Sequence, residues 1–171
     1  MVKRAIVISA AMAALWFAPG ARAQRSGTTA LVVRVTPEAH LNPPQVTLRF
    51  RVSADGASDV ASQTETIAAW VRALPGQQIR LTALPGALTG PAGVVPGSAI
   101  RFSGTPTRAT SGGQSAACTS GSFNAAAAQD LVSGWQRSGT LTCAVTFSLA
   151  DPRGLPPGAY MAVVNLSLWA Q

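Results

Sequence analysis

Alternation of apolar and polar residues predicts strands along most of this chain. The clearest stretch is 138–170, where two runs each place their apolar side chains on one face. The apolar positions are Leu141, Cys143, Val145, Phe147 and Leu149 in the first run, and Tyr160, Ala162, Val164, Leu166 and Leu168 in the second. Between the runs, Asp151-Pro152 and Pro156-Pro157-Gly158 favour a chain reversal. The pattern therefore predicts a β-hairpin with Tyr160 in the core.

Further strands are predicted before this hairpin. Residues 29–36 and 46–52 alternate, and residues 64–74 and 78–84 flank Pro75-Gly76 and predict a second hairpin. A long loop at 85–97 precedes a short strand at 99–104, and a polar segment follows at 105–121. The stretch PEAHLNPP, which contains His40, is expected to form a turn between two strands.

Residues 124–132 allow two interpretations. Either Asn124 caps one short helix, or the segment is an irregular crossover that ends in a strand near Val132. The whole set of about seven strands, with turn signals between them, predicts an all-β sandwich of two sheets with Greek-key connections. A single open sheet would leave one apolar face in water.

The N-terminus predicts export. Lys3 and Arg4 precede an apolar run at 5–17, and Ala21-Arg22-Ala23 follows as a small-residue cleavage site. We therefore expect a signal peptide at 1–23, cleavage after Ala23, and one β-sandwich domain at 24–171 that is secreted or periplasmic. No transmembrane segment is expected in the mature protein, because no later stretch approaches the roughly 20 apolar residues that a membrane helix needs.

Charge adds a weak hint of anion binding. Loss of Lys3, Arg4 and Arg22 leaves ten arginines against six acidic residues and lowers the formal net charge from +7 to +4. Arginine without lysine fits either genomic base composition or selection for bidentate anion binding. Five arginines fall at predicted outward positions, namely Arg34, Arg49, Arg51, Arg80 and Arg101. On neighbouring strands they would form a basic stripe for acidic polysaccharide; otherwise they line a solvated sheet face.

Two cysteines follow the expected signal peptide. Because the protein passes through an oxidising compartment, we expect Cys118 and Cys143 to form a disulfide. The alternative, a reactive or metal-binding thiol, lacks a CxxC spacing and a nearby histidine.

Candidate chemistry is sparse. The one histidine, His40, is a catalytic candidate only with a carboxylate such as Glu38, and no GxSxG, HExxH or phosphate-loop motif occurs. Asp55, Asp59 and Glu65 are interpreted as turn residues rather than calcium ligands. Trp135 and Trp169 are candidates for stacking on a glycan if they are exposed; the alternative, which is commoner for tryptophan, is a buried side chain. We therefore expect no cofactor, no metal and no catalytic set. Nucleic acid is not an expected partner, because no aromatic residues interleave with the arginines.

The closing sequence carries a resemblance. LPPGAYMAVVNLSLWA, after SGTLTCAVTFSLAD, resembles the final strands of bacterial secreted immunoglobulin-like domains, including spore-coat-protein-U-like and pilin-like subunits. The resemblance implies an immunoglobulin-like fold. The expected signal peptide, this immunoglobulin-like pattern and the lack of a catalytic set together favour a non-enzymatic structural or interaction module of the cell envelope, with an envelope protein or acidic polysaccharide as its partner. The alternative is a carbohydrate-binding, adhesin or pilin-like subunit assembled by strand donation.

Self-assembly would use strand edges. The segment 24–35 has a polar lead and the alternating residues Leu31, Val33 and Val35 that a donated strand needs. We expect it to complete its own sandwich, since a short connection lets it fold back beside the next strand. The alternative is that it completes a neighbouring copy.

Overall fold

The computed structural model describes residues 36–54, 62–124 and 127–171, all within the compact unit Arg34–Gln171. The expected signal peptide at 1–23 lies outside these residues, as does the expected strand at 29–36 apart from Thr36. Within the described part, the structure is all-β and its strands pair antiparallel. The predicted fold class is confirmed at this level.

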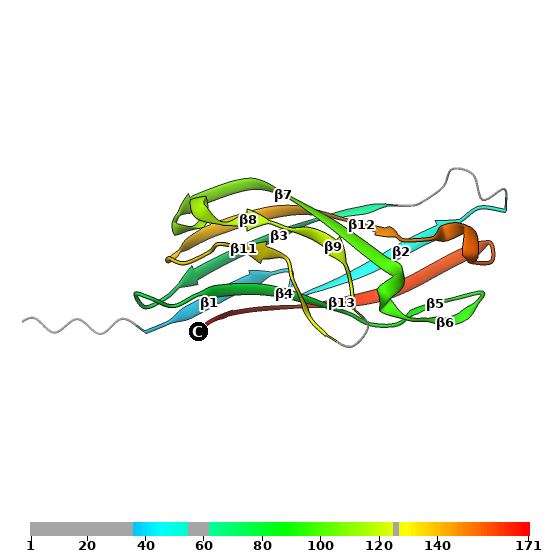
Figure 1. Cartoon of the computed structure of the whole chain (residues 1–171), viewed down its shortest axis with the longest axis horizontal. Coiled ribbons are helices and arrows are strands. Elements are labelled where there is room, and N and C mark those ends of the chain that lie inside the picture. The colour runs from blue at the N-terminus through cyan, green and yellow to red at the C-terminus, as the bar shows by residue number, and fades with distance from the viewer. Residues whose placement is uncertain (1–35, 55–61, 125–126) are drawn as a thin grey trace, which may run out of the picture. The chain divides into compact units, whose positions relative to one another are not determined.

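Two antiparallel sheets share one hydrophobic core (Figure 1). Sheet A has the order β1 (Glu38–Asn42), β3 (Gln63–Arg72), β12 (Gly139–Leu149), β7 (Ile100–Ser111) and β9 (Ser120–Ser122). Sheet B has the order β10 (Gln129–Asp130), β4 (Ile79–Pro85), β13 (Gly158–Ala170), β5 (Leu88–Gly90) and β6 (Gly93–Val95), and β2 (Gln45–Val52) also pairs with β13. A small third sheet joins β11 (Val132–Ser133) to β8 (Ala117–Cys118). The 3-10 helices are η1 (Gly97–Ala99), η2 (Gly112–Ser115) and η3 (Pro152–Gly154).

The alternation in the last two strands is confirmed by burial. Every predicted inward residue of β12 is at most 5% exposed, and Tyr160, Ala162, Val164 and Leu166 of β13 are buried. Leu168, near the end of β13, is only half-buried. The Tyr160 hydroxyl donates a hydrogen bond to the Pro156 carbonyl at 2.8 Å, so the buried ring keeps its polar group satisfied.

The predicted hairpin at 138–170 is wrong, however, because β12 and β13 belong to different sheets. The connection at 150–157, which includes η3, carries the chain from one layer to the other (Figure 1). The apolar faces of the two strands therefore meet across the core. Alternation indicates which face of a strand is buried. It does not indicate whether the next strand lies in the same sheet or in the opposite sheet.

The second predicted hairpin fails for the same reason. β3 lies in sheet A and β4 in sheet B, and the turn around Pro75-Gly76 connects the layers. The loop predicted at 85–97 instead contains the hairpin of β5 and β6. β7 continues to Ser111, well past the predicted end at residue 104, because hydroxyl-rich residues pair along β12.

The turn predicted at PEAHLNPP contains a strand. β1 pairs with β3 along its whole length, so His40 lies opposite Trp70 rather than in a loop. Pro43 and Pro44 end β1, and β2 begins directly afterwards in the other sheet. Because four of the five residues of β1 are exposed, its sequence shows almost no alternation of apolar and polar residues.

The segment at 124–132 has no α-helix in its described part. Asn124 and Ala127 form an isolated bridge, and β10 and β11 follow. Leu131 and Val132 are buried, which agrees with the crossover interpretation.

Candidate functional site

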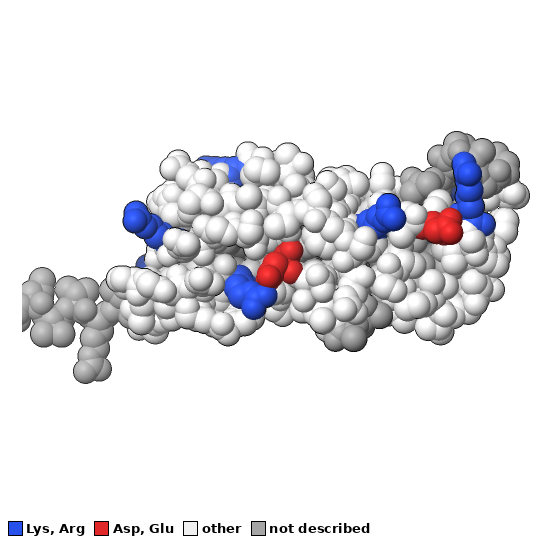
Figure 2. All heavy atoms as spheres, in the orientation of Figure 1, with Lys and Arg blue, Asp and Glu red and all other residues white. Residues whose placement is uncertain are grey.

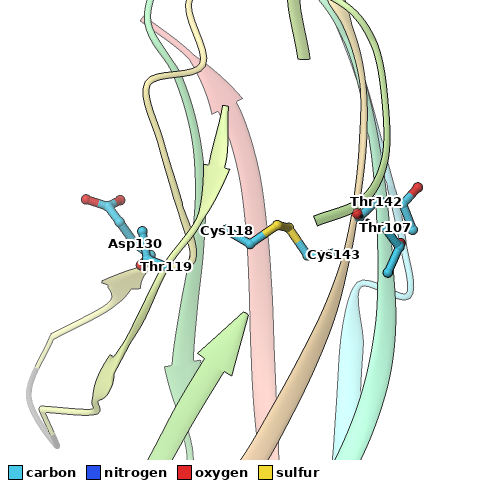
Figure 3. Close-up of a disulfide and its surroundings, with 6 residues drawn as sticks. All are labelled: Thr107, Cys118, Thr119, Asp130, Thr142 and Cys143. Carbon is cyan, nitrogen blue, oxygen red and sulfur yellow. Dashed lines mark hydrogen bonds between the residues drawn. A yellow bond between two sulfur atoms is a disulfide. The ribbon is translucent and has the colours of Figure 1, made fainter. Parts of the chain in front are cut away.

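The predicted disulfide is present. Cys118 of β8 is bonded to Cys143 of β12, and Figure 3 shows Cys143 pointing away from Thr107 and Thr142 toward its partner. Cys143 is fully buried. The Thr119 hydroxyl donates to the Asp130 carbonyl at 2.6 Å, so the chain beside Cys118 is also tied to β10. The disulfide therefore fastens the small third sheet to the central strand of sheet A.

The predicted arginines do not form one stripe. Arg49 and Arg51 lie on β2 and Arg80 lies on β4, all in sheet B, whereas Arg101 lies on β7 in sheet A. Arg34 lies outside the described residues. Arg49 pairs with Met161 and Arg80 with Trp169, so these two arginines are separated by about 26 Å along β13. On the face seen in Figure 2, the basic side chains are likewise scattered.

Arg80 is already engaged. Its guanidinium donates to both carboxylate oxygens of Asp130, at 2.7 to 3.0 Å, and lies over the Trp169 ring at 5.3 Å from the ring centre. The hydrogen bonds to Asp130, and then its negative charge, raise the pKa of Arg80 above its ordinary value. The Arg80 guanidinium thus covers part of the Trp169 ring, which leaves a smaller ring surface for a sugar to stack on.

Trp135 is buried, so it is not a glycan-stacking residue. Its side chain is 1% exposed, and its indole Nε1 donates to the Arg137 carbonyl at 2.9 Å. The backbone carbonyl of Trp135 accepts a hydrogen bond from the amide of Ile79, which begins β4. Trp135 is therefore a core residue that anchors the chain between β11 and β12.

A different tryptophan lies on an outer face. Trp70 of β3 is half-buried, the His40 ring lies 5.2 Å from its centre, and Arg72 lies over the ring at 5.6 Å. His40 Nε2 lies 2.7 Å from Glu38 Oε1 in an exposed pair. Glu38 is therefore the carboxylate beside His40. Both side chains are at least half exposed, so water screens their interaction.

Beside Trp70, the outer face of sheet A has a shallow depression of about 590 Å³, which we call the sheet A depression. Cross-strand register explains its shape. One row contains His40, Trp70, Thr140 and Thr110, and the next contains Asn42, Ala68, Thr142 and Arg108. The small side chains of Ala68, Thr140 and Thr142 form the floor between larger walls. Trp70 and Arg108 both line the depression, and they lie on the two strands that flank β12.

A β-bulge lies at the edge of the sheet A depression. Arg108 pairs with Thr142 and Pro106 with Cys143, so Thr107 is the extra residue. The Thr107 hydroxyl donates to the Thr142 carbonyl at 3.1 Å, as the close-up in Figure 3 shows from the disulfide side. Bulges turn side chains away from the regular pleat and tolerate proline, which lacks an amide donor. This bulge sets the direction of Arg108.

A larger hollow, of about 890 Å³, lies among the turns that follow β3, β7 and Trp135. Two of its polar side chains make hydrogen bonds to the backbone of the turn that follows β3. Gln77 accepts a hydrogen bond from the amide of Leu74, and the Ser138 hydroxyl bonds to both the amide and the carbonyl of Ala73. The sheet A depression differs, because within the described ranges neither Arg108 nor Asn42 makes a side-chain hydrogen bond or ion pair.

Along one edge of β13, the end of the strand has no pairing partner among the described residues. The pairing with β2 ends at Asn165 and Gln45, and the amide of Leu166 donates to the carbonyl of Pro44. By the period of two, the amides of Leu168 and Ala170 point to that same side. No strand among the described residues pairs with them there, because β4 occupies the opposite side.

Sequence reasoning missed the sheet A depression. Trp70 has the outward parity of Thr64 and Thr66, which was a usable signal, but Arg108 lies in the polar segment 105–121, for which no strand was predicted. Within the described ranges, no three His, Cys, Asp or Glu side chains are placed to hold a metal ion, and no helix could cross a membrane. Comparison of the chain with protein-family models, with curated proteins and with solved structures found no match.

Proposed function

We propose that the protein is a secreted, non-enzymatic interaction module of the bacterial cell envelope, exported by the segment 1–23. The observation that carries the proposal is an exposed apolar group beside arginine on the outer face of sheet B. Met161 is 47% exposed, and it pairs with Arg49 on one neighbouring strand and with Thr89 on the other. Thr89 in turn pairs with Val94, which is 73% exposed. We call these four residues the Met161 surface. Adjoining exposed apolar residues mark interaction surfaces more often than isolated ones do.

The disulfide supports the extracytoplasmic part of the proposal. Disulfides persist in oxidising compartments and are rare in the cytoplasm. The Cys118–Cys143 bond joins two segments of the fold rather than lying in an exposed terminus.

The test is export. When the full chain is produced in a Gram-negative host, we expect a mature protein that begins at Gln24, carries no free thiol and fractionates outside the cytoplasm. Mass spectrometry and thiol titration measure both features. A variant with Ala21 and Ala23 both changed to Asp is the matched control, and it should remain unprocessed. Retention of the unmodified chain in the cytoplasm with both thiols free would refute the proposal.

We further infer an immunoglobulin-like Greek-key arrangement. It is supported by consecutive strands that change sheets: β3 is followed by β4 in the other layer, and β12 by β13. Nuclear Overhauser contacts in solution between Glu65 and Val145, and between Ala83 and Leu166, would test the two pairings on which it depends.

Subunit assembly by strand donation is the second candidate, and the end of β13 that no described strand pairs with favours it. The segment 24–35 is the natural occupant, either in its own molecule or in a neighbour. Hydrogen exchange at the Leu168 and Ala170 amides distinguishes the two. Slow exchange in the monomer, with unfolding on deletion of residues 24–36, supports self-completion. Fast exchange that becomes slow when a deletion variant captures a synthetic 24–36 peptide supports assembly.

A further inference from the structure

We propose that the sheet A depression binds an acidic sugar residue of a polysaccharide, with Trp70 stacking on the ring and Arg108 binding its carboxylate. This inference deepens the proposed envelope role by naming a ligand class and a site for it. It uses residues of the outer face of sheet A that lie apart from the Met161 surface of sheet B.

The walls of the depression supply the two chemistries that a sugar acid requires. An indole ring offers an apolar face with a polar edge, and guanidinium offers a planar fork that matches a carboxylate. Trp70 lines the depression, whereas Arg72, which lies over the Trp70 ring, does not. Part of the Trp70 side chain therefore borders the depression, although the His40 ring also lies 5.2 Å from the indole ring.

Charge favours an anion. Arg108 is exposed, and no acidic side chain lines the depression. The nearest acid on this side of β1, Glu38, is held by His40. A carboxylate beside Arg108 would thus meet an arginine that makes no ion pair with any described residue.

The floor and its size favour a short glycan over a protein segment. Thr140, Thr142 and Thr110 present hydroxyl groups, and Asn42 adds an amide, so sugar hydroxyls have donors and acceptors within reach. Thr110 and Thr140 already bond to each other, which fixes their positions. A volume of about 590 Å³ is typical of a small-ligand site. A stable protein partner would need about 800 Å² on each side.

The distance between Trp70 and Arg108 allows one sugar ring to reach both residues. Trp70 and Arg108 are two strands apart and one row apart, so their Cα atoms lie about 12 Å from each other by ordinary sheet geometry. A sugar ring that rests on Ala68 and Thr142 would contact both walls at once.

The test is a titration of protein expressed from the full chain with trigalacturonate, followed by calorimetry and by tryptophan fluorescence. Galactotriose, which has the same ring size without carboxylates, is the matched neutral ligand. We expect saturable binding of trigalacturonate that weakens with added salt. Arg108→Gln should weaken it about tenfold, as expected for loss of a charged hydrogen bond.

Four variants locate the site. Trp70→Ala should weaken binding about tenfold or more and remove the fluorescence change, and Trp70→Phe should retain part of the affinity. Ala68→Leu fills the floor without removing a contact and should also block binding. Arg101→Gln removes a charge from the same face of β7 outside the depression, and should change affinity by less than about twofold. Circular dichroism and melting curves confirm that each variant is folded.

Three results would overturn the proposal. They are equal affinity for galactotriose, an Arg101→Gln effect as large as that of Arg108→Gln, or no saturable binding of trigalacturonate by the folded protein. None of them would change the export result, so the failure of the sugar site and the failure of the envelope role are distinguishable.

Discussion

The strands β12 and β13 share the same alternating sequence pattern but differ in how their edges are covered. β12 pairs with β3 and β7 along nearly its whole length, and its inward and outward residues alternate without interruption. β13 pairs with β2 along one edge over residues 158–165 and with β4 along the other edge over residues 164–170, and its last residues are half-buried. The difference shows that burial on a face and coverage of an edge are separate properties. Burial of one face of a strand forms the core. Coverage of an edge determines where a strand from another chain can pair.

The largest expected effect is at Tyr160 of β13. Tyr160→Ala should lower the free energy of unfolding by about 3 to 5 kcal/mol, because it removes a fully buried aromatic ring. Tyr160→Phe keeps the ring and loses only the hydrogen bond to Pro156, so it should cost about 1 kcal/mol. Urea denaturation measures both. A loss below about 1 kcal/mol in Tyr160→Ala, the scale of surface substitutions, would contradict the buried position.

Removal of the disulfide should loosen the small third sheet, which the bond joins to β12. Replacing both Cys118 and Cys143 by Ala should destabilise the fold by about 3 to 4 kcal/mol on the chain-entropy model for a separation of 25 residues. Hydrogen exchange should accelerate first in β8 and β11, which the bond fastens to sheet A.

A reductant provides the control for this comparison. It should lower the stability of the unmodified protein to that of the double variant and leave the variant unchanged. Equal melting curves for the oxidised and reduced protein would show that the third sheet does not depend on the bond.

A pair of leucines tests the two strands directly. Leu141 of β12 is 1% exposed, whereas Leu168 of β13 is half-buried. Leu141→Ala should cost about 2 to 5 kcal/mol, the range for truncation in a packed core. Leu168→Ala should cost about 1 kcal/mol, because part of the side chain already contacts water. Similar losses at both positions in urea melts would mean that the end of β13 is covered as completely as β12.

Strand faces could be predicted from the sequence, but strand partners could not. The inward sets of β2, β12 and most of β13 follow the period of two, because burial on one face leaves a local signature. Neither predicted hairpin forms, because turn residues show that the chain reverses but not whether it stays in the same sheet. β1 was missed because an exposed edge strand has little apolar alternation.

The candidate site shows the same division. The Cys118–Cys143 bond could be predicted because only two cysteines follow the expected signal peptide. The sheet A depression could not, since it depends on the register of four strands and on a bulge at Thr107. The sequence left two alternatives open for Trp135, glycan stacking or burial, because tryptophan has both an apolar body and a polar edge; the structure shows burial.

The smallest expected effect concerns an edge that the protein covers with a side chain. Gln63 of β3 accepts a hydrogen bond from the amide of Arg49 at 2.9 Å and donates to the carbonyl of Thr47 at 3.1 Å. Its amide therefore binds the edge of β2 that faces away from β13. A side chain that occupies backbone groups in this way prevents another strand from pairing with them.

Gln63→Ala should destabilise the fold by only about 1 kcal/mol, because water can replace both hydrogen bonds at an exposed edge. The sharper readout is local: the Arg49 amide should exchange faster in Gln63→Ala than in the unmodified protein. Gln45→Ala, a change of the same kind at an exposed position of β2, is the control and should leave Arg49 unchanged. If exchange at Arg49 is the same in all three proteins, the Gln63 amide does not protect this edge, and β2 is as available to a second chain as the end of β13.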